Sequence, residues 1–255
     1  MKRKLLLINA ALLLLLGLMV AFYPKLNQVR TDIGVSEEVQ IFYREASREA
    51  DPSGNRARHV NPTSIPPQSG ETPDPERPFS ELYQAMVAHN RFLYETGQES
   101  LSDPWSYQQE VFDLSQYGLE GEAVAVIRID RLELELPVFL GATADHMNRG
   151  AAQLSQTSMP IGGPNTNCVI AGHCGWTGAI FFRYLSNLQV GDEIELTNLW
   201  DELHYTVADM KIINPTDVDK ILIQEGRDLL TLLTCHPYGT GGRYRLVVYC
   251  ERNND

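Results

Sequence analysis

The chain begins with a hydrophobic segment long enough to cross a lipid bilayer. Three basic residues, Lys2 to Lys4, precede an apolar run from Leu5 to Phe22 that is interrupted only by Asn9. As a helix, these 18 residues span about 27 Å, close to the thickness of the hydrocarbon core. Basic residues before such a run favour keeping that end in the cytoplasm and exporting the rest. The sequence therefore predicts a cytoplasmic tip at residues 1–4, one transmembrane anchor at residues 5–22 and an exported domain.

A cleaved signal peptide is the alternative interpretation of the same segment. Its apolar region would be shorter, and a cleavage site with small residues should follow it. The sequence from Met19 to Pro24, MVAFYP, matches such a site poorly. An uncleaved anchor is therefore the prediction. It places the protein in the plasma membrane, crossing once, with its N-terminus inside and the rest of the chain outside.

The composition is that of a protein with a folded core. Hydrophobic residues make up 43% and charged residues 21% of the 255 residues, which is ordinary for a globular protein. The net charge of −12 disfavours non-specific binding to nucleic acid, so no such partner is expected. Four cysteines (Cys168, Cys174, Cys235 and Cys250) in an exported chain suggest disulfides, although a domain of this size folds without them. A disulfide between Cys168 and Cys174 is left open.

Residues 23–78 predict a stalk followed by a linker. Val39, Phe42 and Ala46 have helical spacing, but the apolar stripe is thin, so we expect a polar and only partly helical stalk. Residues 51–78 are rich in proline, which excludes a regular helix or a central strand and predicts a mobile linker. After this linker, apolar residues recur at three- and four-residue steps from Phe79 to Gly97, which predicts a helix that ends at that glycine.

From Glu122 onward the pattern changes to short β-branched runs. We expect strands at 123–129, 132–136, 167–171, 193–197, 204–213, 229–235 and 243–250, and short helical pieces at 144–151 and 181–187. Seven or eight short strands with few helices predict a mainly β fold that closes into a barrel, because closure removes exposed sheet edges. The predicted barrel occupies residues 122–252 and leaves a short tail at 253–255.

Three strand-end residues carry candidate chemistry. Cys235 ends an apolar strand just before a Pro/Gly turn, where a nucleophile is held by the strand and open to substrate. A thiol needs a nearby base or cation to react at neutral pH, and His173 ends a second apolar strand. Arg245 begins a strand a short loop after the cysteine and could stabilise an oxyanion. Each residue alone also has a structural interpretation: a buried cysteine, a hydrogen-bonded core histidine and a surface-paired arginine.

Together these segments resemble the sortase family. The sequence TLLTC at 231–235 matches the TLxTC signature, AGH at 171–173 matches the catalytic-histidine strand, and Arg245-Leu-Val-Val matches the catalytic-arginine strand. The resemblance runs through about residues 122–252. It implies an eight-stranded sortase-type β-barrel and a cysteine transpeptidase with Cys235 as nucleophile, His173 as general acid/base and Arg245 as oxyanion and substrate clamp. Sortases cleave an LPxTG-type sorting signal after its threonine, form a thioacyl-enzyme and transfer the acyl group to an amine.

Arg243 is the less favoured alternative for the clamp. It lies two residues before Arg245, and side chains two apart in a strand share a face. The resemblance favours Arg245 because that residue directly precedes the apolar strand.

The segment Ser102-Asp103-Pro104-Trp105 resembles the lid of class C, pilin-polymerising sortases. The resemblance implies that Trp105 covers Cys235 and that Asp103 pairs with the catalytic arginine. Such a cap would desolvate the thiol and occupy the guanidinium that the substrate needs. A solvent-exposed turn is the alternative, because Asp-Pro is common in turns. Residues 79–121 are thus predicted to form an N-terminal helix and a lid segment.

Class C sortases join the sorting signal of one pilin to a lysine of the next. Many carry a second transmembrane segment at the C-terminus, whereas this sequence stops at Asp255. Two alternatives therefore stay open: a sortase that anchors surface proteins to the cell wall, and a non-catalytic, membrane-tethered pilus-assembly module. The expected partners are a sorting-signal-bearing surface protein or pilin, an amine acceptor (a pilin lysine or cell-wall peptide) and the membrane of a Gram-positive bacterium.

A zinc site is the remaining alternative for the sulfur and imidazole groups. The residues Cys168, His173, Cys174, Cys235 and His236 offer enough soft ligands for a zinc ion. Their spacing is not that of a familiar zinc finger, and a bound metal would consume the nucleophile. We therefore expect neither a metal nor a cofactor.

Overall fold

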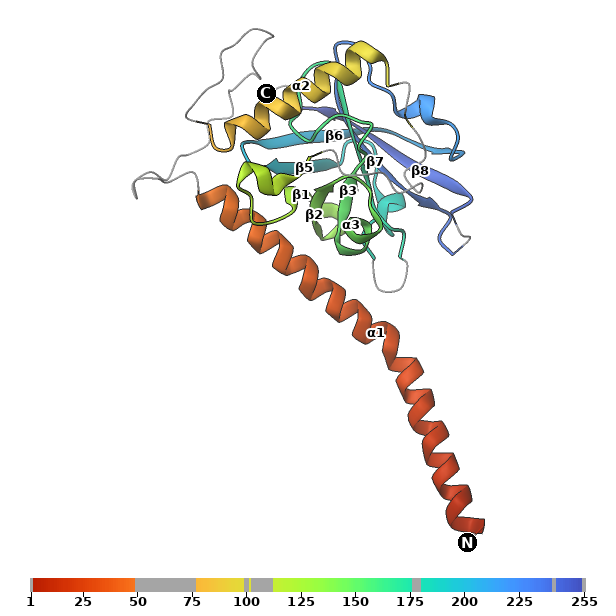
Figure 1. Cartoon of the computed structure of the whole chain (residues 1–255). Helices are drawn as coiled ribbons and strands as arrows, with labels where there is room; N and C mark the ends of the chain where they lie inside the picture. The colour runs from red at the N-terminus through yellow and green to blue at the C-terminus, as the bar shows by residue number, and fades with distance from the viewer. Residues whose placement is uncertain are drawn as a thin grey trace.

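The computed structural model describes residues 2–48, 77–98, 101, 112–175, 180–239 and 242–253, with side chains in the first helix described from Leu12 to Ser47. A long N-terminal helix leads up to a β-barrel, and a second helix lies against the barrel (Figure 1).

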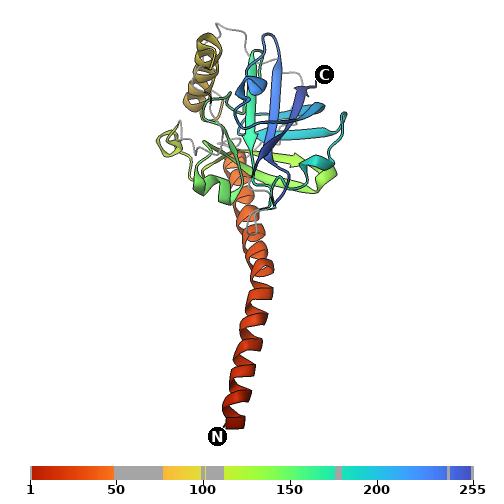
Figure 2. The same cartoon turned by 90° about the vertical axis from the view of Figure 1, so that its right-hand side faces the viewer.

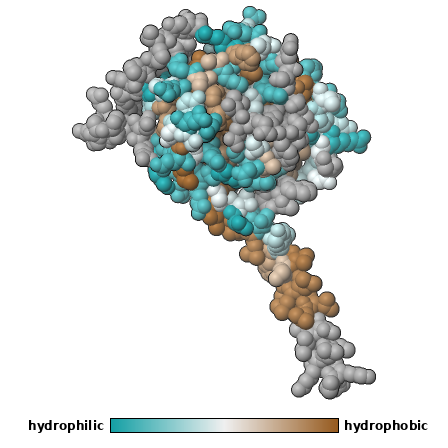
Figure 3. Space-filling view, in the orientation of Figure 1, coloured by the Kyte–Doolittle hydropathy of each residue, from teal (hydrophilic) through white to brown (hydrophobic). Residues whose placement is uncertain are grey.

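The first helix, α1 (Lys2–Arg48), continues from the predicted anchor through the predicted stalk. Large apolar side chains between Leu12 and Ile33 are exposed, which is costly in water and favourable in lipid. Figure 3 shows them as an apolar band below the mostly polar surface of the barrel. Among the described residues, α1 is the helix long and apolar enough to cross a bilayer. The stalk, expected to be only partly helical, is helical as far as Arg48.

Eight strands close into a barrel. They are β1 (Ala123–Ile129), β2 (Leu134–Leu140), β3 (Ala151–Gln153), β4 (Thr166–Ala171), β5 (Glu193–Asn198), β6 (Glu202–Ile213), β7 (Asp228–His236) and β8 (Tyr244–Arg252). The order around the barrel is β1-β2-β3-β4-β7-β8-β6-β5. The pairs β2–β3 and β4–β7 are parallel, and the other neighbours are antiparallel. The prediction of an eight-stranded closed barrel is confirmed.

The helix α2 (Ser80–Thr96) ends as the sequence predicts. Gly97 follows it with φ of 70°, and its N–H donates to the carbonyl of Tyr94. This left-handed conformation suits glycine and stops the helix. The described chain also contains short 3-10 turns: η2 (Leu114–Tyr117), η3 (Asp130–Leu132), η4 (Leu185–Asn187) and η5 (Val218–Ile221).

Two short helical predictions were too long. The helix α3 (Ala144–Arg149) ends before Ala151, which begins β3. Alanines favour helix locally, but this segment pairs with β2 on one side and β4 on the other, and tertiary pairing overrides propensity. In the segment 181–187, which was expected to be helical, only the last three residues form a helical turn, the 3-10 turn η4.

The strand β1 is buried on both faces because the barrel wall is covered from outside. Ala125 and Ile127 face the apolar barrel interior, whereas Val124 and Val126 belong to a second apolar cluster outside it. That outer cluster includes Phe42 of α1 and side chains of α2. Burial on both sides explains why the first five residues of β1, Ala123 to Ile127, are all apolar, whereas Arg128 near its end is exposed.

Replacing Phe42 with alanine tests whether α1 is part of the folded domain. Its ring is fully buried, so Phe42→Ala should lower the free energy of unfolding by about 3–5 kcal/mol. Phe92→Ala is a matched control, because Phe92 on α2 is 61% exposed and its loss should change stability by less than about 0.5 kcal/mol. Urea unfolding in detergent micelles measures both. Equal effects of the two variants would contradict the packing of α1 on the barrel.

Candidate active site

The strands β4, β7 and β8 bring the three sequence-predicted residues to one edge of the barrel. β7 lies between the other two, parallel to β4 and antiparallel to β8. Ala171 pairs with Leu233, and the N–H of Gly172 donates to the carbonyl of Leu233 over 3.1 Å. His173 therefore follows the end of β4 at the level where Cys235 follows Leu233 along β7. Two separate apolar strands thus deliver the imidazole and the thiol to the same end of the barrel.

Arg245 lies directly opposite Cys235 in the β7–β8 ladder. Its Nη1 atom is 4.0 Å from the Sγ atom of Cys235. The same nitrogen donates to the carbonyl of Gly242 over 2.5 Å and to that of Tyr244 over 3.2 Å. Arg245 is only 5% exposed. A buried cation is therefore held beside the sulfur by the backbone carbonyls of Gly242 and Tyr244, where it can stabilise negative charge.

Arg243 has a different environment. It is exposed, and its guanidinium lies 5.5 Å from the centre of the Tyr244 ring. The sequence argument assumed that Arg243 and Arg245 share a strand face, but β8 begins only at Tyr244. Strand alternation therefore does not orient Arg243, and of the two arginines it is Arg245 that contacts Cys235.

His173 is partly buried beyond the end of β4. Burial lowers its pKa, because a buried imidazole is harder to charge. Its carbonyl accepts from the N–H of Phe182 over 2.9 Å. The preceding residue must be small, since a Cβ on Gly172 would lie 2.7 Å from the Phe182 ring. The carbonyl of Gly172 also accepts from the hydroxyl of Thr234 over 2.7 Å, which ties the histidine loop to β7.

All four cysteines are free thiols. Cys168 and Cys250 are buried in the barrel interior, and burial raises the pKa of both. Cys174 is partly exposed; burial raises its pKa, while a hydrogen bond with Thr234 and the charge of Arg183 oppose that shift. The disulfide that the sequence left open is not formed, and Cys168 is separated from solvent as a small core residue.

Two residues near the site were missed from the sequence. Gly242 has φ of +77°, and a Cβ there would lie 2.7 Å from the sulfur of Cys235. The second is Arg183, whose guanidinium lies 4.0 Å from the centre of the Tyr238 ring. Tyr238 follows Cys235 by three residues. Gly242 had only a weak signal in the sequence, a glycine just before a strand that begins with basic residues. Arg183 had none, because its contact with Tyr238 joins segments that are far apart in the chain.

The zinc alternative gains no support from the described residues. Within the described chain, the group of three possible ligands that converges is Glu195, Glu202 and His204. These lie on the β5–β6 pair, and all three already take part in ion pairs, Glu195 with Arg128 and His204 with Glu202. The cysteines and histidines around Cys235 do not form such a group there.

The predicted lid residues Asp103, Pro104 and Trp105 lie outside the described residues. Their proposed contacts with Cys235 and Arg245 stay predictions.

Comparison with known proteins identifies relatives of this chain. Residues 127–253 match a family model described as a sortase domain. A Bacillus subtilis protein named sortase D is 28% identical over 134 residues, covering 52% of this chain and 65% of that protein. The solved sortase C1 of GBS pilus island 1 is 27% identical with a TM-score of 0.62, covering 69% of this chain and 83% of that one. The sortase C-1 of Streptococcus pneumoniae is 33% identical with a TM-score of 0.56, covering 68% of this chain and 92% of that one.

The chain spans 65%, 51% and 57% of the length of three curated relatives that it matches, from Bacillus subtilis, Streptococcus agalactiae and Listeria monocytogenes. The activity, substrates and partners of those whole proteins therefore do not transfer directly to it.

Replacing Gly242 with alanine tests its contact with the thiol. The new methyl group would meet the Cys235 sulfur, so Gly242→Ala should slow alkylation of Cys235 by about tenfold through displacement of the sulfur or of Arg245. The rate is measured with a thiol reagent in a Cys174→Ser background, because Cys174 is also accessible. Gly239→Ala is the control: its φ of +80° imposes the same strain, but nothing lies within 4 Å of the new atom. Equal slowing in both variants would contradict a specific contact.

Proposed function

Because the chain belongs to the sortase family, we propose that it is a membrane-anchored cysteine transpeptidase with Cys235 as its nucleophile. The observation that carries the proposal is the register of β7 and β8, which sets Cys235 opposite a buried Arg245 at the barrel edge where His173 also lies. A non-catalytic assembly module would have no need to keep a buried arginine against a thiol.

In the proposed reaction, the Cys235 thiolate attacks the threonine carbonyl of an LPxTG-type sorting signal. Arg245 stabilises the oxyanion of the tetrahedral intermediate, with its guanidinium already held by the carbonyls of Gly242 and Tyr244. His173, as imidazolium, gives its proton to the departing amine, and the peptide bond breaks as the thioester forms. The neutral imidazole then takes a proton from the incoming amine, which attacks the thioester and releases the thiolate.

The acceptor in this proposal is a lysine amine of a pilin. Support comes from the solved relatives, which include a sortase C1 named for a pilus island and a sortase C-1. The curated relatives are named sortase D and sortase A, so anchoring of surface proteins to the cell wall is kept as the second candidate. The lid of Asp103, Pro104 and Trp105 belongs to the pilin-polymerising proposal and is supported by its sequence resemblance alone.

The proposed location is the extracellular face of the plasma membrane of a Gram-positive bacterium. Support comes from the exposed apolar half of α1, from the basic residues that precede it and from the organisms of the relatives. The N-terminus would then lie in the cytoplasm and the barrel outside.

The two arginines separate this mechanism from its alternatives. Arg245→Ala should lower kcat/KM for transfer of an LPxTG-type peptide to an amine by about 100- to 1,000-fold, because the oxyanion loses its donor. Arg243→Ala should retain activity within about twofold, since its side chain is exposed. Product formation is followed by chromatography, and circular dichroism checks that each variant is folded. The reverse result would assign the clamp to Arg243, and no product from the unmodified protein would favour the non-catalytic module.

The pH profile tests the thiol–imidazole pair. The reactive form needs one proton shared between Cys235 and His173, so kcat/KM should be bell-shaped. The lower of the pair's two apparent pKa values cannot exceed the pKa of its more acidic member. Burial lowers the pKa of His173 from 6.5. The acid limb should therefore have an apparent pKa below 6.5. A flat profile, measured with a peptide that does not titrate in this range, would contradict the pairing, as would an acid limb above that value.

A further inference from the structure

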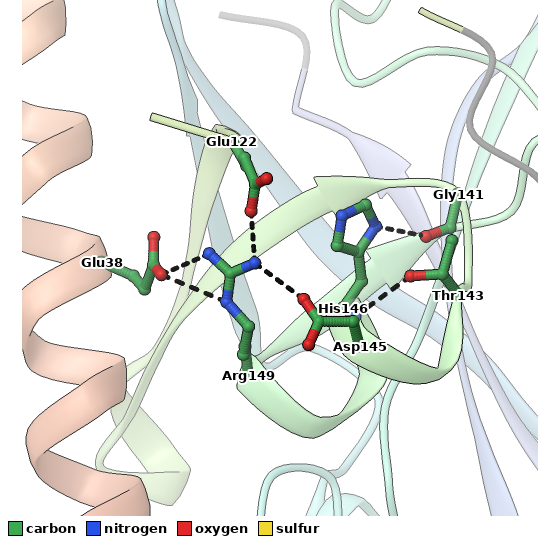
Figure 4. Close-up of polar contacts among 7 residues, drawn as sticks. All are labelled: Glu38, Glu122, Gly141, Thr143, Asp145, His146 and Arg149. Carbon is green, nitrogen blue, oxygen red and sulfur yellow. Dashed lines mark hydrogen bonds and ion pairs between the residues drawn. The ribbon is translucent and has the colours of Figure 1, made fainter. Parts of the chain in front are cut away.

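The helix α1 is joined to the barrel by a group of ion pairs around Arg149 of α3 (Figure 4). The guanidinium bonds the carboxylate of Glu38 through two nitrogens, at 2.5 and 3.2 Å. It also contacts Asp145 at 2.9 Å and Glu122. Glu38 comes from α1, Asp145 from α3 and Glu122 from the segment entering β1. One cation thus connects three elements, and such a network holds position better than an isolated surface pair.

The support of Arg149 is itself rigid. The Thr143 hydroxyl caps the start of α3 by accepting from the N–H of His146 over 3.1 Å, and Nδ1 of His146 lies 2.9 Å from the carbonyl of Gly141 (Figure 4). The His146 ring stacks on Phe139 with 5.0 Å between ring centres. The Arg149 guanidinium lies 4.9 Å from the centre of the same Phe139 ring. The partner of Glu38 is therefore fixed to the barrel wall.

A second contact lies two turns further along α1. The buried Glu45 carboxylate accepts from the N–H groups of Glu120 and Gly121, the latter over 3.0 Å. A Cβ on Gly121 would lie 2.9 Å from Ile41, so the turn before β1 lies tightly against the helix. Between these polar contacts, Phe42 and Val39 are buried in the outer apolar cluster. The helix is thus held over residues 38–45 by charge, hydrogen bonds and apolar packing together.

The same helix connects this contact to the membrane-spanning segment. Pro24 lies inside it at the end of the predicted anchor, where it removes one backbone hydrogen bond and kinks the helix, and residues 25–48 continue as one helical segment to the contact. From Phe22 to Glu38 the rise is about 24 Å at 1.5 Å per residue. Figures 1 and 2 show the end of β8 on the upper side of the barrel and α1 descending from its lower side. β8 therefore starts, and the antiparallel β7 ends, at the side toward which α1 descends. The edge that carries Cys235 and Arg245 faces the membrane-spanning part of the chain.

We propose that α1 is a rigid strut that holds the edge carrying Cys235, His173 and Arg245 toward the bilayer at a set height, through Glu38–Arg149 and Glu45. The strut selects substrates whose cleavage site lies close to the membrane surface and disfavours those held further out. This inference rests on the proposed transpeptidase function. It adds that residues 23–48 set the distance between the bilayer and the edge that carries Cys235, which a flexible stalk would not do.

The test changes the length of the strut outside the contact. Seven helix-forming residues are inserted between Lys25 and Leu26, both exposed. They raise the barrel by about 10 Å and turn it by only about 20°. The substrate is an LPxTG-type peptide joined by a short spacer to a transmembrane helix, placed with the enzyme in the same lipid vesicles. Turnover of this substrate should fall by about tenfold or more, because effective concentration collapses when the two sites cannot meet.

Two matched arms make the result specific. A spacer longer by three extended residues, about 10 Å, should restore turnover by the lengthened enzyme. A Gly/Ser insertion of the same length at the same place should retain turnover of the short-spacer substrate, because a flexible joint lets the barrel reach down.

A soluble LPxTG-type peptide distinguishes failure of the strut proposal from failure of the proposed transpeptidase function. All variants should turn it over equally, since the site is unchanged. Unchanged turnover of the short-spacer substrate by the rigid insertion overturns the strut while leaving the transpeptidase intact. Failure of the unmodified protein to process either substrate overturns the transpeptidase function itself.

Discussion

The site depends on β7 lying between β4 and β8. Parallel pairing with β4 sets His173 at the level of Cys235, and antiparallel pairing with β8 sets Arg245 directly opposite it. A one-residue slip of either ladder would turn the thiol or the guanidinium to the other face of the sheet. Leu230 and Leu232 of β7 belong to the packed interior of the closed barrel and Leu233 to a separate apolar cluster, so a slip would disrupt the packing of both and be costly. The same hydrophobic pattern that builds the core therefore aligns the reacting groups.

Burial of these groups has opposing effects that the local structure balances. A nearly buried arginine costs desolvation energy, but Arg245 recovers part of it through the carbonyls of Gly242 and Tyr244. Burial of the His173 imidazole lowers its pKa, because a charged ring is harder to hold away from water. The arrangement keeps a permanent cation beside the thiol and a histidine that gives up its proton readily. Both properties suit a thioester reaction in which charge moves between sulfur, carbonyl oxygen and amine.

The membrane helix and the barrel form one folded unit. Phe42 and Val39 complete an apolar cluster on the outer wall of β1 and β2, so the barrel exposes apolar surface when this part of α1 is absent. Glu38 and Glu45 add directional contacts that set the position of the helix along and around its axis. In the proposed arrangement, attachment to the membrane and orientation of the site therefore depend on the same contact.

The sequence by itself determined the candidate membrane-spanning segment, the strand content, the closed barrel and the identity of Cys235, His173 and Arg245 as candidates, because these depend on local periodicity and on short motifs. Only the tertiary structure decided the order of the strands, the three-residue β3 and which arginine contacts the sulfur, because pairing between distant segments sets them. The position of α1 on the barrel could not be predicted from the sequence either. Glu38 and Glu45 lie in the segment expected to be a polar stalk, and their partners, Arg149 and the Glu120–Gly121 turn, are more than 70 residues away in the chain.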